Sequence, residues 1–234
     1  MEDDLRLVLL VLSNDRTMLE ANGLYRFFHE GDEEVVALAG VSLRIEAGDM
    51  VAVMGPSGSG KSTLLSCLGA LDEPDGGMVL VDRQPISRRS EPERARFRAQ
   101  HIGVLLQTGN LLSHLTVEEN IRVARRLAGA RRGRVDPTLL DRLGIAHRRS
   151  ARPSQLSGGE AARAGLAVAC TNEPNVLLAD EPTGEVDSST EAEVIILLRG
   201  EARRGAAVLV VTHSQAVARA ADRVLHIDDG RLMS

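Results

Sequence analysis

The glycine-rich segment GPSGSGKST, residues 55–63, constrains the fold most, because it directly follows a short and fully apolar run, Met50–Met54. Such a run predicts a buried parallel strand, and a helix is expected after the loop, over residues 61–71. The spacing Gly-x-x-x-x-Gly-Lys-Ser is typical of a phosphate-binding P-loop, whose backbone N–H groups wrap around phosphates at a helix N-terminus. The sequence therefore predicts an α/β fold that binds a nucleoside triphosphate.

Lys61 is the only lysine in the chain, and the other 27 basic residues are arginine. Ammonium is a compact charge on a flexible stem, whereas guanidinium is a wide planar fork. A position that keeps lysine against this bias needs a small cation in a tight space. We expect Lys61 to reach the β- and γ-phosphates and Ser62 to offer its hydroxyl to Mg²⁺. The predicted phosphate-binding residues are Gly55, Pro56, Ser57, Gly58, Ser59, Gly60, Lys61, Ser62 and Thr63.

Two later apolar runs also end in polar residues. The run 176–179 ends at Asp180 and Glu181, and the run 206–211 is followed one residue later by His213. The carboxyl ends of parallel strands form the ligand site of an open α/β sheet. We expect Asp180 to hold Mg²⁺ through water, Glu181 to polarise the attacking water and His213 to contact a γ-phosphate.

Between about residues 87 and 170 the pattern is mostly helical, with one strand expected at 102–106 and helices near 117–127, 137–143 and 157–170. Gln107 follows the strand and can reach Mg²⁺ or the lytic water. In LSGGE, residues 156–160, Ser157 and two glycines present a hydroxyl and N–H groups at a positive helix end, which predicts a second phosphate-binding nest.

The flanking regions give weaker signals. Residues 35–45 alternate and break at 47–49, which indicates an antiparallel β element, and the last strand is expected at 224–227. We predict one domain over 17–231, preceded by an extension of residues 1–16 without a clear role.

Composition indicates a cytoplasmic protein. No stretch approaches the ~18 apolar residues of a membrane span, and the six-residue run Leu7–Leu12 follows acidic residues, the wrong charge for a signal peptide. The two cysteines, Cys67 and Cys170, lack metal-ligand spacing and are expected to be buried thiols.

The net charge of −5 is unevenly distributed, because the segment 83–152 holds 16 arginines and 6 acids. This basic segment has three interpretations that its charge does not separate: a solvated helical face, a surface for anionic lipid head groups, or a surface for nucleic acid.

Taken singly, Glu181, His213 and Gln107 could be a capping acid, a strand-end histidine and a surface amide. Together, in this order and spacing, the motifs resemble the ATP-binding cassette (ABC) ATPases: Walker A at 55–63, the Q-loop at Gln107, the signature at 156–160, Walker B at 176–181, the D-loop ending at Asp187, and the switch residue His213. The resemblance implies a RecA-like P-loop NTPase, mostly parallel, with an antiparallel β subdomain and an inserted helical subdomain at about 87–170.

The resemblance also implies residue roles and an assembly. ATP and Mg²⁺ are the expected cofactors, and the signature would complete the site of the opposite subunit in a homodimer that encloses two ATP molecules. The implied catalytic residues are Glu181, His213, Gln107 and Lys61, and the implied metal-binding residues are Ser62, Gln107 and Asp180. Nucleotide contacts outside the P-loop are expected from Ser157, Gly158, Gly159, Glu160, Asp187 and an adenine-stacking aromatic at Phe28, with Tyr25 as the alternative.

Four segments, 31–36, 69–72, 107–120 and 180–184, are similar to the lipoprotein-releasing and macrolide-exporter group. This implies an ATPase on the inner face of the cell membrane, paired with an integral-membrane permease that has a large extracytoplasmic domain and docks on the helical middle. Its task would be export, lipoprotein release or mechanotransmission. The alternative is a soluble ABC ATPase acting on nucleic acid or ribosomes, although no nucleic-acid partner is expected.

Three positions and one segment depart from the family pattern. They are Leu106, Ala161, Val168 and the D-loop sequence 184–187. None of them removes a catalytic group, so hydrolysis is expected to be retained.

Overall fold

The computed structural model describes residues 16–30, 33–129, 137–184 and 186–233. Within this part of the chain, a six-stranded sheet has the order β10-β9-β3-β8-β7-β6, and all neighbours except the β10–β9 pair are parallel. Its strands are β3 (Met50–Met54), β6 (Ile102–Leu105), β7 (Val176–Asp180), β8 (Ala207–Val211), β9 (Arg223–Asp228) and β10 (Arg231–Met233). The predicted mostly parallel α/β sheet is confirmed.

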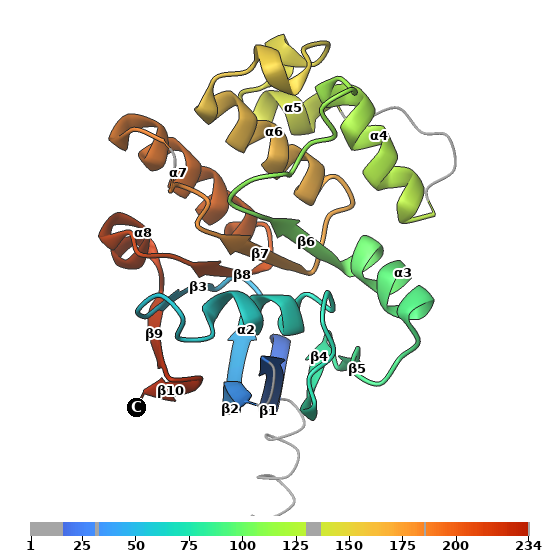
Figure 1. Ribbon diagram of the computed structural model, residues 1–234. Coiled ribbons are helices and arrows are strands. Elements are labelled where there is room, and N and C mark those ends of the chain that lie inside the picture. Colours follow the sequence, from blue (N-terminus) through green and yellow to red (C-terminus); the bar gives the residue numbers. More distant parts are fainter. Residues whose placement is uncertain (1–15, 31–32, 130–136, 185, 234) are drawn as a thin grey trace, which may run out of the picture.

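Helices cover both faces of this sheet (Figure 1), as the uninterrupted apolar character of its central strands requires. On β7, Leu178 packs in the same hydrophobic cluster as α2 (Lys61–Leu68). Leu177, the preceding residue, faces the other way and packs with α6 (Gly158–Cys170) and α7 (Ser188–Arg203). The P-loop helix and the signature helix therefore lie on opposite faces of one sheet.

A second, four-stranded antiparallel sheet of order β2-β1-β4-β5 lies beneath α2 in Figure 1. It comprises β1 (Thr17–Glu30), β2 (Glu33–Glu46), β4 (Gly76–Val81) and β5 (Gln84–Pro85). Leu38 and Val41 of β2 share a hydrophobic cluster with Leu64 and Leu68 of α2. The antiparallel element predicted at 35–45 is confirmed as part of β2.

The helical middle is also confirmed. It contains α3 (Glu91–His101), α4 (Val117–Leu127), α5 (Pro137–Arg142), the 3₁₀ turns Ala146–Arg148 and Pro153–Gln155, and α6. The caps set these boundaries: Thr116 accepts from the N–H of Glu119 at the start of α4, and Ser157 accepts from the N–H of Glu160 at the start of α6.

Several boundaries differ from prediction. Helix α2 ends at Leu68 rather than at residue 71, because Ala70 has a left-handed φ of 54° that a helix does not allow. Strand β9 is not the last strand, since Asp229 and Gly230 take positive φ values of 42° and 71° and turn the chain back into β10.

Of the extension predicted at 1–16, residues 1–15 lie outside the described part of the chain. Strands β1 and β4 and the helices α7 and α8 (Gln215–Ala220) had no individual prediction. In the described residues, no helix is both long enough and apolar enough to cross a membrane.

Candidate nucleotide-binding site

The P-loop connects β3 to α2 and is held by the backbones of two other strands. A Cβ at Gly55 would lie 2.0 Å from the carbonyl oxygen of Ile227, and one at Gly60 would lie 2.3 Å from the carbonyl oxygen of Ala37. Gly60 also has a φ of 98°, which side chains rarely tolerate. The loop can thus follow this path only with glycine at both positions.

Lys61 is buried inside this loop, with 7% of its surface exposed. Its Nζ donates to the carbonyl oxygens of Gly55, at 2.9 Å, and Pro56, at 2.7 Å. An ammonium group has three N–H donors, so these two bonds leave one for a further acceptor. The tight space that the lone lysine predicted is present.

Asp180, at the end of β7, lies against the start of α2. It receives a hydrogen bond from the Ser62 side chain. Burial raises the pKa of the Asp180 carboxyl and nearby Glu181 adds to the rise, while the Ser62 bond and the Lys61 charge oppose it. Residues 61, 62, 180 and 181 are therefore brought together as predicted.

The donor set at Ser62 and Asp180 fits Mg²⁺, which prefers oxygen ligands and keeps waters and substrate phosphates in its shell. No cluster of three or more His, Cys, Asp or Glu side chains that could hold a metal occurs in residues 16–30, 33–129, 137–184 and 186–233. Ser62 and Asp180 are therefore the residues that would hold a magnesium ion here. The buried hydroxyl of Ser59, which has no partner among the described residues, is a further group suited to contact a phosphate.

Glu181 follows Asp180 with a left-handed φ of 45°, held by a hydrogen bond from its N–H to the carbonyl oxygen of Val211. Its Oε2 accepts from the Thr212 hydroxyl and from the His213 N–H, each at 3.3 Å. Its Oε1 is buried and has no hydrogen-bond partner in the described residues, and His213 Nε2 lies 3.6 Å away. The hydrogen-bonding capacity of this oxygen is therefore unused in the described part of the chain.

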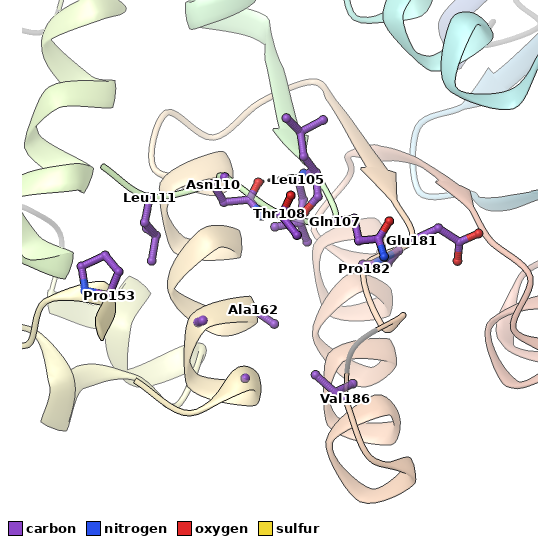
Figure 2. Close-up of a pocket in the computed structure, with 14 residues that line it drawn as sticks. Leu105, Gln107, Thr108, Asn110, Leu111, Pro153, Ala162, Glu181, Pro182 and Val186 are labelled. Carbon is purple, nitrogen blue, oxygen red and sulfur yellow. Dashed lines mark hydrogen bonds between the residues drawn. The ribbon is translucent and has the colours of Figure 1, made fainter. Parts of the chain in front are cut away.

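Gln107 lines a cavity of about 250 Å³ together with Glu181 and with Gly158 of the signature. Figure 2 shows Gln107 and Glu181 on the wall of this cavity, with the Glu181 carboxylate pointing away from the other labelled side chains. A Cβ on Gly184 would lie 3.4 Å from Gln107 Nε2, so the residues after Walker B also border this amide. The Q-loop, Walker B and the signature thus meet at one cavity.

The signature is built around a capping box. Ser157 Oγ accepts from the Glu160 N–H at 3.2 Å, and Glu160 Oε2 accepts from the Ser157 N–H at 2.8 Å. Glu160 Oε1 also accepts from Arg148 at 2.7 Å. These bonds lower the pKa of Glu160 to about 2, with the Ser157 N–H as the largest cause. Glu160 therefore stabilises the N-terminus of α6 as part of this capping box. The Ser157 hydroxyl is an acceptor in the box, so its own proton remains available for donation to another group.

Asp187 caps α7. Its Oδ1 accepts from the N–H groups of Ser189, at 2.9 Å, and Thr190, at 3.1 Å. Bonds from the Ser189 hydroxyl and from Thr190 hold the pKa of this carboxyl well below its usual range. In the D-loop, residue 185 lies outside the described residues.

Both aromatic candidates on β1 are about two-fifths exposed, at 40% for Phe28 and 43% for Tyr25. The guanidinium carbon of Arg26 lies 4.7 Å from the centroid of the Phe28 ring. The Tyr25 ring stacks with Phe27, at 6.2 Å between centroids. Phe28 lies on the antiparallel sheet, apart from the cluster around Lys61.

Ser157 also lies apart from that cluster, on the opposite face of the main sheet. Two contacts were not predicted from the sequence: Arg148 hydrogen-bonds to Glu160, and Arg26 lies over the Phe28 ring.

A P-loop whose lysine and serine face two acids at a strand end defines a P-loop ATPase. Residues 38–184 match the ABC transporter family, and the chain belongs to that family. The resemblance drawn from these motifs is confirmed.

The chain is 42% identical over 221 residues to the macrolide export ATP-binding/permease protein MacB 1 of Yersinia pestis bv. Antiqua (strain Antiqua). It is 43% identical over 219 residues to MacB of Burkholderia pseudomallei (strain 1710b). These matches cover 93% and 92% of the chain but 34% of each relative, so the chain spans about a third of the length of these curated relatives.

Solved structures give the same family. The ATP-binding cassette MJ0796, in a dimeric post-hydrolysis state bound to ADP and Pi, matches with a TM-score of 0.84 and 32% identity, over 93% of this chain and 97% of that one. A second dimeric structure of MJ0796, a bacterial ABC transporter cassette, matches with a TM-score of 0.83 and 34% identity, with the same coverage.

Proposed function

We propose that this chain is the ATP-hydrolysing subunit of a membrane ABC transporter, which dimerises on ATP and drives an integral-membrane permease with a large extracytoplasmic domain. Its work would be export, lipoprotein release or mechanotransmission from the inner face of the membrane. The observation that carries this proposal is the cluster of Lys61, Asp180, Glu181 and His213 at the carboxyl edge of the parallel sheet.

Binding is the task of the P-loop. Lys61 and the backbone N–H groups of 58–63 would hold the phosphates, with Ser62 and Asp180 as the residues for Mg²⁺. When bound, the ion would neutralise charge on the β- and γ-phosphate oxygens. Lys61 Nζ now donates to two carbonyl oxygens of the loop. It could turn outward to a phosphate by rotation about the bonds of its flexible side chain.

Glu181 is proposed as the group that accepts the proton of the attacking water, through its buried and unbonded Oε1. Gln107, on the same cavity, would orient that water. His213 holds Glu181 by its N–H, and its side chain would stabilise negative charge on the γ-phosphate oxygens.

A homodimer is proposed because the signature and the P-loop lie on opposite faces of the sheet. One chain cannot bring Ser157 to its own Lys61 without dismantling the core between them. Two chains arranged head to tail can bring each signature to the other's P-loop, where Lys61 and the partner's Ser157 would clamp the γ-phosphate. The dimeric MJ0796 cassettes, one of them bound to ADP and Pi, support this assembly.

The permease is proposed because the similar curated proteins are named ATP-binding/permease proteins and are about three times as long as this chain. The competing nucleic-acid role loses support from local neutralisation of the basic segment 83–152. Arg94, Arg142 and Arg148 each form an ion pair with an acid from outside that segment. The positive surface is thus smaller than its sequence charge suggests.

The test is the Glu181→Gln variant, which keeps the shape but removes the proton acceptor. We expect ATP to be bound and a stable dimer to form, with turnover reduced at least ~100-fold. The matched control is Glu173→Gln, an exposed acid that precedes β7 where Glu181 follows it. Size-exclusion chromatography with light scattering and a phosphate-release assay give both readouts. Full turnover in Glu181→Gln would contradict the role of Glu181, and an ATP-independent monomer would contradict the dimer.

A further inference from the structure

Arg26 and Phe28 lie on the same face of β1, since residues two apart on a strand point the same way. The guanidinium carbon of Arg26 lies 4.7 Å from the centroid of the Phe28 ring, which is within cation–π range. Phe28 is nevertheless 40% exposed. Because the guanidinium lies over one face of the ring, a base could stack only on the other face.

Two carboxylates fix the Arg26 guanidinium in place. Its Nε and Nη2 donate to the two oxygens of Asp72, at 2.8 and 3.1 Å, and its Nη1 donates to Asp75 at 3.0 Å. The same oxygen of Asp75 accepts from the Phe27 N–H at 2.8 Å. A bidentate pair fixes the plane of the guanidinium as well as its position, so the ring beside it is held in a defined orientation.

Asp72 in turn is tied to the P-loop helix. The N–H groups of Leu71 and Asp72 both donate to the carbonyl oxygen of Ser66, at 2.9 and 3.2 Å. Ser66 belongs to α2, which begins at Lys61. Hydrogen bonds therefore connect α2, the helix that begins at the P-loop, through Asp72 to Arg26, and the Arg26 guanidinium in turn lies over the Phe28 ring.

We propose that Arg26 is a positioning residue for the nucleotide base: it forms the back layer of a stack of guanidinium, phenyl ring and purine, with its distance from the phosphates fixed through Asp72. This rests on the proposed function, and within it on Phe28 as the stacking aromatic. The cation draws ring electron density to its own side, which makes the opposite face a better partner for an electron-rich purine.

The environment of Tyr25 supports the choice of Phe28. Tyr25 lies on the face of β1 that also carries Phe27, with which its ring stacks. A Cβ on Gly40 would lie 3.0 Å from the Tyr25 hydroxyl, and one on Gly76 would lie 3.4 Å from its ring. Tyr25 therefore packs over two glycines of neighbouring strands, where it covers backbone that no side chain of those glycines covers. This packing gives Tyr25 a structural role that Phe28 does not have.

The test compares ATP with inorganic tripolyphosphate, which has the phosphates but no base, by calorimetric titration. For Arg26→Ala we expect a 2- to 5-fold rise in Kd for ATP, the size of a partly exposed cation–π contact, and no rise in Kd for tripolyphosphate. Asp72→Asn, which keeps the guanidinium but weakens its anchor, should change ATP binding in the same direction. Arg26→Lys should recover part of the loss, because it keeps the charge without the bidentate fork.

The matched control is Arg44→Ala. Arg44 is also an arginine of the antiparallel sheet and is paired with an acid, Glu20, at 2.8 Å, but it contacts no aromatic ring in the described residues. It should leave both affinities unchanged. If Arg26→Ala weakens ATP and tripolyphosphate equally, Arg26 is only a scaffold residue and the proposal is overturned. Unchanged ATP binding in Arg26→Ala overturns it as well.

Phe28→Ala separates this failure from failure of the proposed function. Loss of base stacking should raise Kd for ATP by ~10-fold or more. If Phe28→Ala leaves ATP binding intact while Glu181→Gln still loses turnover, the ATPase assignment stands and the base stack does not. If Glu181→Gln turns over normally, the proposed catalytic function fails, whatever Arg26 does.

Discussion

The backbone N–H of His213 donates to one oxygen of Glu181 at 3.3 Å, and the side chain of the same histidine lies 3.6 Å from the other oxygen. Parallel pairing of β7 with β8 brings the two residues together, since Asp180 is in register with Val211. The backbone contact orients the carboxylate and does not depend on the histidine side chain. The two contributions of His213 can therefore be separated by substitution.

We predict that His213→Ala binds ATP but hydrolyses it ~10²–10³-fold more slowly, the usual effect of removing one group that stabilises developing charge. The retained N–H should keep Glu181 in place, so nucleotide affinity should change little. Steady-state phosphate release and calorimetric ATP binding measure the two effects. His226→Ala, an exposed histidine on β9, is the control. Normal turnover in His213→Ala would exclude a catalytic role for this imidazole.

Lys61→Arg is predicted to bind ATP at least ~100-fold more weakly than the wild-type chain, although it keeps the charge. The 7% exposure of Lys61 and its bonds to Gly55 and Pro56 describe a space sized for ammonium. A guanidinium cannot place a compact charge there, and charge-assisted bonds contribute about 1.5–3 kcal/mol each. Calorimetric titration with ATP measures the loss. Near-normal affinity would mean that the loop opens widely on binding, and that burial does not explain the choice of lysine.

The elements that the sequence predicted best are those whose apolar pattern fits only one type of secondary structure. Strands β3, β7 and β8 are short apolar runs whose positions were predicted within a residue, and the helix predicted near 117–127 is α4. Strand β1 gave no usable alternation, because its pairing with β2 shifts register at four points. In α7 the apolar run 194–198 hides the helical period.

Motif order predicted which residues gather around Lys61 but not the contacts that hold them. The Ser62–Asp180 bond joins residues more than a hundred positions apart, and its effect on the Asp180 pKa depends on burial. The hydrogen bonds from Arg148 to Glu160 and from Arg26 to Asp72 likewise join separate elements. No local pattern marks such residues, since their partners become neighbours only through the fold.

Glu160 makes the signature helix sensitive to acid. Its pKa is about 2 in the folded chain, against an ordinary value of 4.5. A carboxyl with a depressed folded-state pKa stabilises the fold fully above its unfolded value, and this contribution is lost as the pH falls through the folded value. The stabilisation from Glu160 should therefore be complete above pH 4.5 and disappear towards pH 2.

The measurement compares urea midpoints of the wild-type chain and Glu160→Gln across this range. Glutamine can still accept the Ser157 N–H in the capping box, so the variant removes the charge and keeps the cap. We expect the wild-type chain to be more stable at pH 6, and the difference to shrink as the pH approaches 2. A difference that is constant with pH would show that the charge of Glu160 contributes nothing to stability.

Gly159 of the signature is predicted to be intolerant of even one added methyl group. A Cβ there would lie 2.5 Å from Thr190 Cγ2 on α7, closer than atoms can approach without movement. We expect Gly159→Ala to destabilise the fold by about 1–3 kcal/mol, the usual effect of overpacking. Gly200→Ala is the control, because a Cβ there meets nothing within 4 Å and alanine favours the helix by ~0.5–1 kcal/mol. Urea denaturation should give shifts of opposite sign.

A second substitution identifies the clash itself. Thr190→Ser removes Cγ2 but keeps the hydroxyl that donates to Asp187 at 2.9 Å, so the α7 cap survives. In the Gly159→Ala background it should recover a large part of the lost stability, whereas alone it should have a small effect. Contacting residues couple by about 0.5–3 kcal/mol in such cycles. Purely additive effects would mean that the Thr190 methyl group is not what the new Cβ meets, and that Gly159 is not needed for packing against α7.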